Sequence, residues 1–106
     1  MFFMSRRKFS FNNIAQIPED LRGIYCFWTH NRCIYVGKAD KLPIRKRLMS
    51  HYKKSHNDDL NLWLNSSIVI EYTYLVVEPA DSKVIDETER IFIKKFRPVT
   101  NKTLNI

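Results

Sequence analysis

Two short runs of aromatic and β-branched residues restrict the fold of this chain more than any other feature. The first run is residues 23–28 (Gly-Ile-Tyr-Cys-Phe-Trp) and the second is residues 32–36 (Arg-Cys-Ile-Tyr-Val), with Thr-His-Asn at 29–31 between them. Residues of these types favour strands, and such a short polar connection makes two strands antiparallel neighbours. The sequence therefore predicts a β-hairpin.

The length of the hairpin loop decides which side chains share a face. An odd loop of three residues pairs Trp28 with Arg32 and hence Tyr25 with Tyr35, whereas an even loop sends the two tyrosines to opposite faces. Asn31 favours the odd loop, because the last position of a three-residue loop is left-handed and asparagine tolerates that conformation. We therefore expect Tyr25 and Tyr35 to lie on one face of the hairpin.

Two helices are predicted after the hairpin. Residues 57–64 indicate a short helix or turn, for which Asp58 is a plausible N-cap. Residues 43–54 predict a longer helix, with a proline suited to its first turn and an apolar stripe at helical spacing formed by Ile44, Leu48 and Tyr52.

The remaining segments complete one small domain over residues 1–106. Residues 68–77 are typical of a central strand that ends at a proline, and residues 1–20 read as an arm that packs across the core. The order β-β-α-(α)-β-α favours a small mixed α/β (α+β) sandwich. Residues 82–95 predict a second long helix, with one side formed by Val84, Ile85, Thr88, Ile91, Phe92 and Phe96.

The charge balance suggests a polyanionic partner without identifying it. The 106 residues include 18 Lys or Arg and 11 Asp or Glu, so the net charge is 18 − 11 = +7. A positive surplus attracts nucleic acids, because bound lysines and arginines release counterions from the phosphates. The same surplus is compatible with a basic surface that serves solubility alone.

Membrane insertion, export and zinc binding find no support in the sequence. No apolar run reaches the ~18 residues that a membrane span needs, and the first cluster of basic residues follows the apolar start instead of preceding it, unlike a signal peptide. We therefore expect a cytoplasmic protein that does not contact membranes. Cys26 and Cys33 match no common zinc motif and are expected to be reduced packing residues.

Two basic side chains fall on one shoulder of the first long helix. Arg47 and His51 are spaced i, i+4 beside the apolar stripe, while Arg45 lies about 160° away from Arg47 at about 100° per residue. The two arginines therefore cannot serve one site. Taken by itself, Arg47 is more typical of a surface arginine whose stem covers apolar neighbours.

Glu89 lies on or beside the apolar side of the second long helix. Ile85, Phe92 and Phe96 flank it at helical spacing, whereas Asp86 falls on a more solvated position. A carboxylate at such a position needs a partner, usually a metal ion or an arginine, because an unpaired buried charge is costly. A carboxylate at the helix edge paired with a lysine remains the alternative.

Five short motifs resemble the GIY-YIG nuclease family in their order and spacing. They are residues 23–25 (Gly-Ile-Tyr), 35–38 (Tyr-Val-Gly-Lys), 46–51 (Lys-Arg-Leu-Met-Ser-His), 89–95 (Glu-Arg-Ile-Phe-Ile-Lys-Lys) and 97–101 (Arg-Pro-Val-Thr-Asn). Each is weak alone, but the resemblance that they form together spans about 80 residues from Gly23 onward and is similar to the N-terminal nuclease domain of excision-repair nickases. In two departures, valine replaces the isoleucine of the second signature, and the segment before the third motif is about two residues longer.

The resemblance implies a fold, a reaction and a set of site residues. It implies a three-stranded antiparallel sheet flanked by helices over residues 23–101, and an endonuclease that hydrolyses DNA with one Mg²⁺ or Mn²⁺ ion per active site. By position, Tyr25 resembles the general base and Tyr35 the neighbour that positions the attacking water. Arg47 resembles the catalytic arginine and Glu89 the metal ligand. The implied set is completed by His51 as a rival base, Lys38, Gly23, Gly37 and Asn101.

The resemblance also suggests partners. Nothing in the sequence is similar to a base-reading module, so specificity is expected from DNA shape, such as branched or damaged DNA, or from a partner protein. Repair or recombination, with a place at the nucleoid, would fit such a substrate. Contacts to the DNA backbone are expected from Lys41, Lys53, Lys54, Lys94 and Lys95, with Arg6, Arg7, Lys8 and Arg97 as further basic candidates.

Two alternatives stay open at this point. The first is a GIY-YIG fold that has lost turnover and binds nucleic acid or a protein, although the presence of Tyr25, Tyr35, Arg47 and Glu89 argues against it. The second is an unrelated basic α/β domain, such as an accessory protein that binds RNA.

Overall fold

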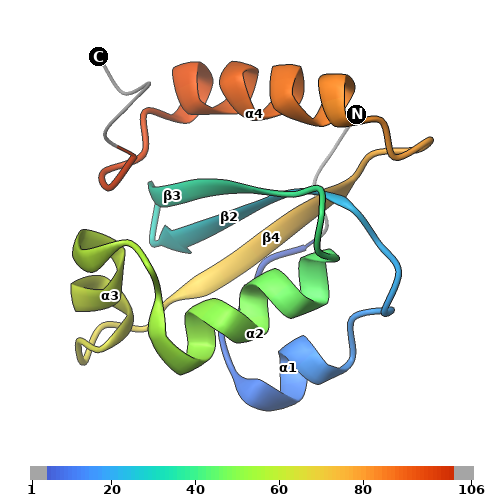
Figure 1. The fold of residues 1–106 in the computed structure, drawn as a ribbon. Helices are drawn as coiled ribbons and strands as arrows, with labels where there is room; N and C mark the ends of the chain where they lie inside the picture. Colours follow the sequence, from blue (N-terminus) through green and yellow to red (C-terminus); the bar gives the residue numbers. More distant parts are fainter. Residues whose placement is uncertain (1–4, 102–106) are drawn as a thin grey trace.

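A computed structural model describes residues 5–101, which form an antiparallel sheet between two layers of helix (Figure 1). Helix α4 covers one face of the sheet, and α1 and α2 lie on the other. The strand order is β1-β4-β2-β3, so β3 is an edge strand. The elements are β1 (Arg7–Lys8), α1 (Phe11–Ala15), β2 (Gly23–Thr29), β3 (Arg32–Ala39), α2 (Ile44–Lys54), α3 (Asp58–Leu64), β4 (Glu71–Val76) and α4 (Ser82–Phe96).

The mixed α/β fold class is confirmed, but the sheet has four strands where three were expected. The additional strand, β1, comes from the N-terminal segment, where Arg7 pairs with Tyr72 and Lys8 with Glu71 of β4. The predicted arm therefore contains a short strand and a short helix, and Ile14 and Ile17 carry its packing role because both are buried. Within residues 5–101, no helix combines the length and apolar character that crossing a membrane requires.

The hairpin forms as predicted, with a different loop. Thr29 pairs with Arg32, which leaves a two-residue loop in which His30, and not Asn31, has a positive φ of 50°. A β-bulge between the pairs Phe27↔Tyr35 and Trp28↔Cys33 then inserts Ile34 as an extra residue. Because the bulge restores the alternation that the even loop had reversed, the two tyrosines still share a face. Tyr25 itself lies opposite Gly37.

The helices agree with the predicted ranges and differ in detail. The N-cap of α3 is Asn57, whose side chain accepts from the Leu60 N–H, and not Asp58. The predicted apolar stripe of α2 is wrong at Tyr52, which is 46% exposed. His51 is buried on this helix instead. Two members of the predicted apolar side of α4 are exposed, namely Val84 and Ile91.

Alternating side chains of β2 supply a core on each face of the sheet. Tyr25 and Phe27 face α2 and join its buried Leu48, while Ile24 and Cys26 face α4. Cys26 and Cys33 are both free thiols in the α4 core, which confirms their packing role.

The segment after α4 returns along the edge strand and closes it. The Thr100 N–H and hydroxyl both donate to the Ile34 carbonyl, the residue inserted by the bulge. The Asn101 side chain then pairs with Val36 in both directions, since its Oδ1 accepts from the Val36 N–H and its Nδ2 donates to the Val36 carbonyl, each at 2.9 Å. The edge strand is thereby held in register from outside the sheet.

We expect Asn101→Ala to lower the free energy of unfolding by about 1–3 kcal/mol, because it leaves the two Val36 backbone groups without their partners. Urea unfolding measures the change. The control is Asn12→Ala on the exposed side of α1, which should shift the midpoint by much less. Equal effects of the two substitutions would contradict a structural role for Asn101.

Candidate active site

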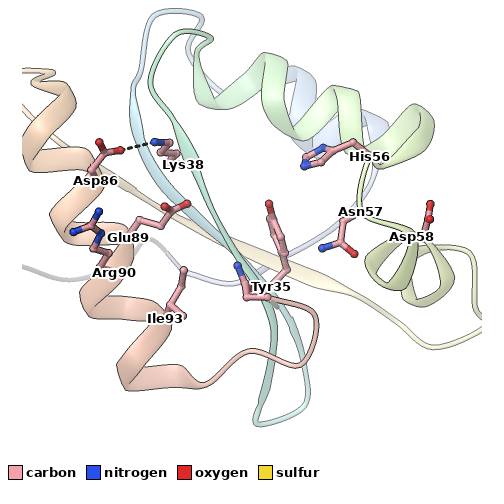
Figure 2. A pocket seen from close by; sticks show the side chains of 10 residues that line it. Tyr35, Lys38, His56, Asn57, Asp58, Asp86, Glu89, Arg90 and Ile93 are labelled. Atoms are coloured by element: carbon pink, nitrogen blue, oxygen red, sulfur yellow. Dashed lines mark hydrogen bonds and ion pairs between the residues drawn. The ribbon is translucent and has the colours of Figure 1, made fainter. Parts of the chain in front are cut away.

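A cleft of about 690 Å³ runs beside β3, between α4 and the loop that joins α2 to α3 (Figure 2). Figure 2 shows Glu89 and Arg90 on the α4 wall, Tyr35 in the middle, and His56 and Asn57 on the opposite wall. The full lining consists of Tyr35, Lys38, His56, Asn57, Asp58, Asp86, Glu89, Arg90, Ile93 and Asn101.

The position of β3 at the sheet edge explains how side chains from both faces reach one cleft. Tyr35 belongs to the face that packs against α2, whereas Lys38 reaches Asp86 on α4 at 2.5 Å. Residues separated by an odd number of positions point to opposite faces of a strand. At an interior strand the sheet would separate them, but at the edge both border the same space.

Glu89 brings an unneutralised carboxylate to this cleft. Burial raises the pKa of Glu89 above its ordinary value, Lys38 lowers it and Asp86 raises it. Within residues 5–101 the Glu89 carboxylate has neither a hydrogen bond nor an ion pair, because Lys38 pairs with Asp86 instead. No lysine within residues 5–101 forms an ion pair with Glu89, so the lysine-paired interpretation is wrong for the described residues, and the carboxylate is available to a cation.

Tyr25 packs beside Tyr35, with ring centroids 6.2 Å apart, and has no exposed surface. Its hydroxyl is 2.8 Å from His51 Nε2 and accepts a hydrogen bond from Arg47 Nη2 at 3.3 Å. Burial raises the pKa of Tyr25 well above its ordinary value, Tyr35 raises it further, and Arg47 lowers it. Tyr25 is therefore a neutral phenol held in a buried polar cluster.

Both glycines of the signature sit where a side chain cannot fit. A Cβ atom on Gly37 would lie 2.5 Å from the Tyr25 hydroxyl oxygen and 2.7 Å from the Tyr35 ring. A Cβ atom on Gly23 would lie 2.0 Å from the Leu75 carbonyl oxygen on β4. Gly37 thus makes room for the two tyrosines, and Gly23 allows β2 and β4 to approach closely.

His51 joins the same cluster as a neutral imidazole. It is 2% exposed, and burial, Arg47 and His56 together lower its pKa to about 3. Its Nδ1 lies 2.9 Å from Ser55 Oγ. His51 therefore reaches Tyr25 on one side and the end of α2 on the other.

The two arginines of α2 diverge as their spacing predicts. Arg47 reaches Tyr25, and its buried Nε has no hydrogen-bond partner within residues 5–101. Arg45 instead approaches Glu19 at 3.6 Å and the Ile17 carbonyl on the side of α1. Only Arg47 belongs to the candidate site.

The five lysines predicted to contact DNA are exposed, and none lines the 690 Å³ cleft. Lys41 borders an adjoining hollow of about 520 Å³, together with Lys38 and Arg47. The other four lie in the last turns of two helices, Lys53 and Lys54 on α2 and Lys94 and Lys95 on α4. The structure therefore brings one of the five next to the site.

Sequence reasoning missed the wall of the cleft that follows α2. His56, Asn57 and Asp58 line it, and Ser55 contacts His51 behind it. The available signal was the density of polar residues at 55–58, one turn after a histidine that had already been singled out.

Comparison with known proteins gives one match. A family model described as the GIY-YIG catalytic domain matches residues 22–105, which is most of the chain. The match contradicts the alternative of an unrelated basic α/β domain. No curated protein and no solved structure gives a significant match.

We expect Glu89→Gln to raise the melting temperature at pH 7 in EDTA. Because the folded state favours protonated Glu89, the wild type loses stability as the pH rises through the raised pKa of this carboxyl, and a glutamine loses none. The gain should vanish near pH 4, where the carboxyl is protonated. Thermal unfolding at both pH values measures it, with the exposed Glu87→Gln as control; no gain at pH 7 would contradict the burial of an unpaired charge.

Proposed function

The chain belongs to the GIY-YIG family, whose domains are generally endonucleases, and on this premise we propose that it hydrolyses DNA phosphodiester bonds with one divalent cation. One observation carries the proposal: a free carboxylate, a phenol and basic side chains border one cleft beside β3. Hydrolysis of a phosphodiester needs a deprotonated water and stabilisation of the negative charge that develops on the phosphate oxygens. These side chains match both needs.

Glu89 is the residue that would hold the cation. Mg²⁺ is commonly bound by one or two carboxylates, with water and substrate oxygens in its remaining positions. The Glu89 carboxylate fits this use because it is half-buried and without an ion pair within residues 5–101. When bound, Mg²⁺ or Mn²⁺ would stabilise the charge on the phosphate and orient it.

Tyr35 is the phenol best placed to receive a proton from the attacking water. It borders the cleft that Glu89 also borders, whereas Tyr25 has no exposed surface. The general-base role that the family resemblance gives to Tyr25 stays a prediction. Because Tyr25 is buried, we propose Tyr35 as the base in its place. Burial raises the pKa of Tyr35, while Arg47 and a hydrogen bond from Tyr25 lower it. Tyr25 would then act through Tyr35.

Arg47 and Lys38 would bind the phosphate. Arg47 uses one N–H on Tyr25 and shares an adjoining hollow with Lys38 and Lys41, so its other N–H groups can reach an anion there. Asn101 supports the site by holding β3, and Gly37 by admitting the two tyrosines.

The proposed substrate is bound through its backbone, and its shape or a partner protein sets the specificity. Backbone contacts from Lys41, Lys53, Lys54, Lys94 and Lys95 would add affinity without reading sequence. Branched or damaged DNA, or a partner protein, would then supply specificity, in repair or recombination within the cytoplasm. A domain that binds nucleic acid without cutting it is the competing function.

Supercoiled plasmid should be nicked by the wild type in Mg²⁺ or Mn²⁺ and left intact in EDTA. We expect Tyr25→Phe, Tyr35→Phe, Arg47→Ala and Glu89→Ala each to slow nicking by ~100-fold or more, as loss of one group that stabilises a transition state typically does. Agarose gels measure the rates.

The matched control is Arg45→Ala, which removes an arginine from the opposite side of the same helix and should nick normally. Nicking at the wild-type rate by any of the four variants would remove that residue from the mechanism. A shifted band without cleavage would favour the function of binding alone.

The pH dependence of kcat/KM separates the two tyrosines. Because the pKa of the Tyr35 phenol is raised, only a small fraction is ionised at neutral pH, and the wild-type rate should increase as the pH rises from 6 to 9. Tyr25→Phe should retain this increase and displace it to higher pH, since it removes a donor to Tyr35. Tyr35→Phe should abolish the increase; if Tyr25→Phe abolishes it instead, Tyr25 is the base.

A further inference from the structure

A line of hydrogen bonds leads from the α2–α3 loop to the tyrosines. The Asn57 N–H donates to Ser55 Oγ at 3.2 Å, Ser55 Oγ lies 2.9 Å from His51 Nδ1, and His51 Nε2 lies 2.8 Å from the Tyr25 hydroxyl. Ser55 is 3% exposed, His51 2% and Tyr25 0%. Bulk water therefore cannot replace a partner that any of these groups lacks.

The hydroxyl hydrogen of Ser55 determines which group donates and which accepts in each of these hydrogen bonds. Ser55 Oγ already accepts from the Asn57 N–H, and within residues 5–101 the acceptor within reach of its own hydrogen is His51 Nδ1. If Nδ1 carried a hydrogen, it would also donate to Ser55 Oγ, and the buried Ser55 hydrogen would be left without a partner. The satisfied arrangement has a bare Nδ1 and a hydrogen on Nε2.

The same assignment of donors and acceptors determines the hydrogen bonds of Tyr25. Its hydroxyl oxygen accepts from Arg47 Nη2 and, in this arrangement, from the His51 Nε2–H. Both of its lone pairs are then used, so its own hydrogen is free to point to another acceptor. Tyr35 is the neighbouring acceptor for this hydrogen, since the two rings lie side by side with their centroids 6.2 Å apart and both border the space above Gly37.

We propose that Ser55 is a positioning residue, which fixes His51 as the Nε2–H tautomer and thereby aims the Tyr25 hydroxyl hydrogen at Tyr35. The tautomer is read from the hydrogen bonds alone, whereas its benefit to Tyr35 rests on the proposed nuclease function. His51 is then a donor to Tyr25 and takes no proton from it, so it is excluded as the base. Ser55 acts on the reaction through two other side chains and touches no substrate.

Long-range ¹H–¹⁵N correlation spectra of the ¹⁵N-labelled full chain test the proposal without substrate. They identify which ring nitrogen of each histidine carries the hydrogen, and His30→Gln and His56→Gln assign the signals of His51 by elimination. We expect His51 to keep its hydrogen on Nε2 from pH 5 to pH 8. A hydrogen on Nδ1 in the wild type, or on both nitrogens, would overturn the proposal.

Substitutions at position 55 then test whether Ser55 sets the tautomer of His51. Ser55→Ala should give a mixture of the two tautomers, and Ser55→Thr, which retains the hydroxyl, should keep Nε2–H. The matched control is Ser66→Ala, because Ser66 Oγ also accepts from the backbone N–H two residues later but lies outside the cluster. An unchanged tautomer in a folded Ser55→Ala protein would overturn the role of Ser55, and if that variant does not fold, the wild-type spectrum decides.

Kinetics connect the tautomer to the reaction. Ser55→Ala should lower kcat by about tenfold while KM stays within about twofold, since Ser55 does not reach the cleft. Ser55→Thr should restore kcat. A wild type with the Nε2–H tautomer and no nicking would overturn the nuclease function alone, and nicking with the opposite tautomer would overturn this proposal alone.

Discussion

The pairing of Asn101 with both backbone groups of Val36 is the contact on which the candidate site depends. It holds the edge strand β3 from the side that no other strand covers, and the Thr100 contacts with Ile34 hold the bulge next to it. Tyr35 and Lys38 lie on either side of this anchored stretch and face opposite layers of the protein. An edge strand fixed in this way lets the tyrosine layer and the α4 layer share one cleft.

The site contains groups that lower the stability of the folded protein. Glu89 carries a charge in a half-buried position, and Arg47 leaves its buried Nε without a partner within residues 5–101. Tyr25, His51 and Ser55 are different, because their polar atoms satisfy one another in a place that water does not reach. Tyr25, His51 and Ser55 are thus satisfied, while Glu89 at the cleft and Arg47 at the adjoining hollow retain unused bonding capacity. This division is what a site needs if it holds its chemistry in place and still binds a charged substrate.

Much of the fold could be predicted from the sequence, because the strongest signals are local. The hairpin, both long helices and the strand before the proline follow from runs of residues whose types and spacing agree with one another. The additional strand β1 could not be predicted, since its two residues, Arg7 and Lys8, have no strand pattern of their own. They pair only because β4 offers an open edge. Tyr52 was misplaced because its ring turns outward to pack against Phe9 and Phe11 of the N-terminal segment.

The candidate site was predicted in its residues better than in its geometry. The two tyrosines share a face as predicted, but for a different reason, because the bulge at Ile34 depends on Thr100, 66 residues away. Helical spacing alone separated Arg47 from Arg45 correctly, since both lie on one rigid element. Whether Tyr25 or Tyr35 borders the cleft depends on the packing around Gly37, which no local pattern contains. Ser55 and the cleft wall after it are marked in the sequence only by the density of polar residues at 55–58, and contacts with separate segments decide where they lie.

A crystal structure of the Tyr35→Phe variant with Mn²⁺ and a short DNA duplex tests the central claim most directly, because the anomalous scattering of manganese distinguishes the ion from water. The account predicts one manganese ion bound to the Glu89 carboxylate, with a backbone phosphate between that ion and Arg47 and with residue 35 facing the phosphorus. Manganese absent from Glu89, or DNA bound only on a surface away from β3, would contradict it.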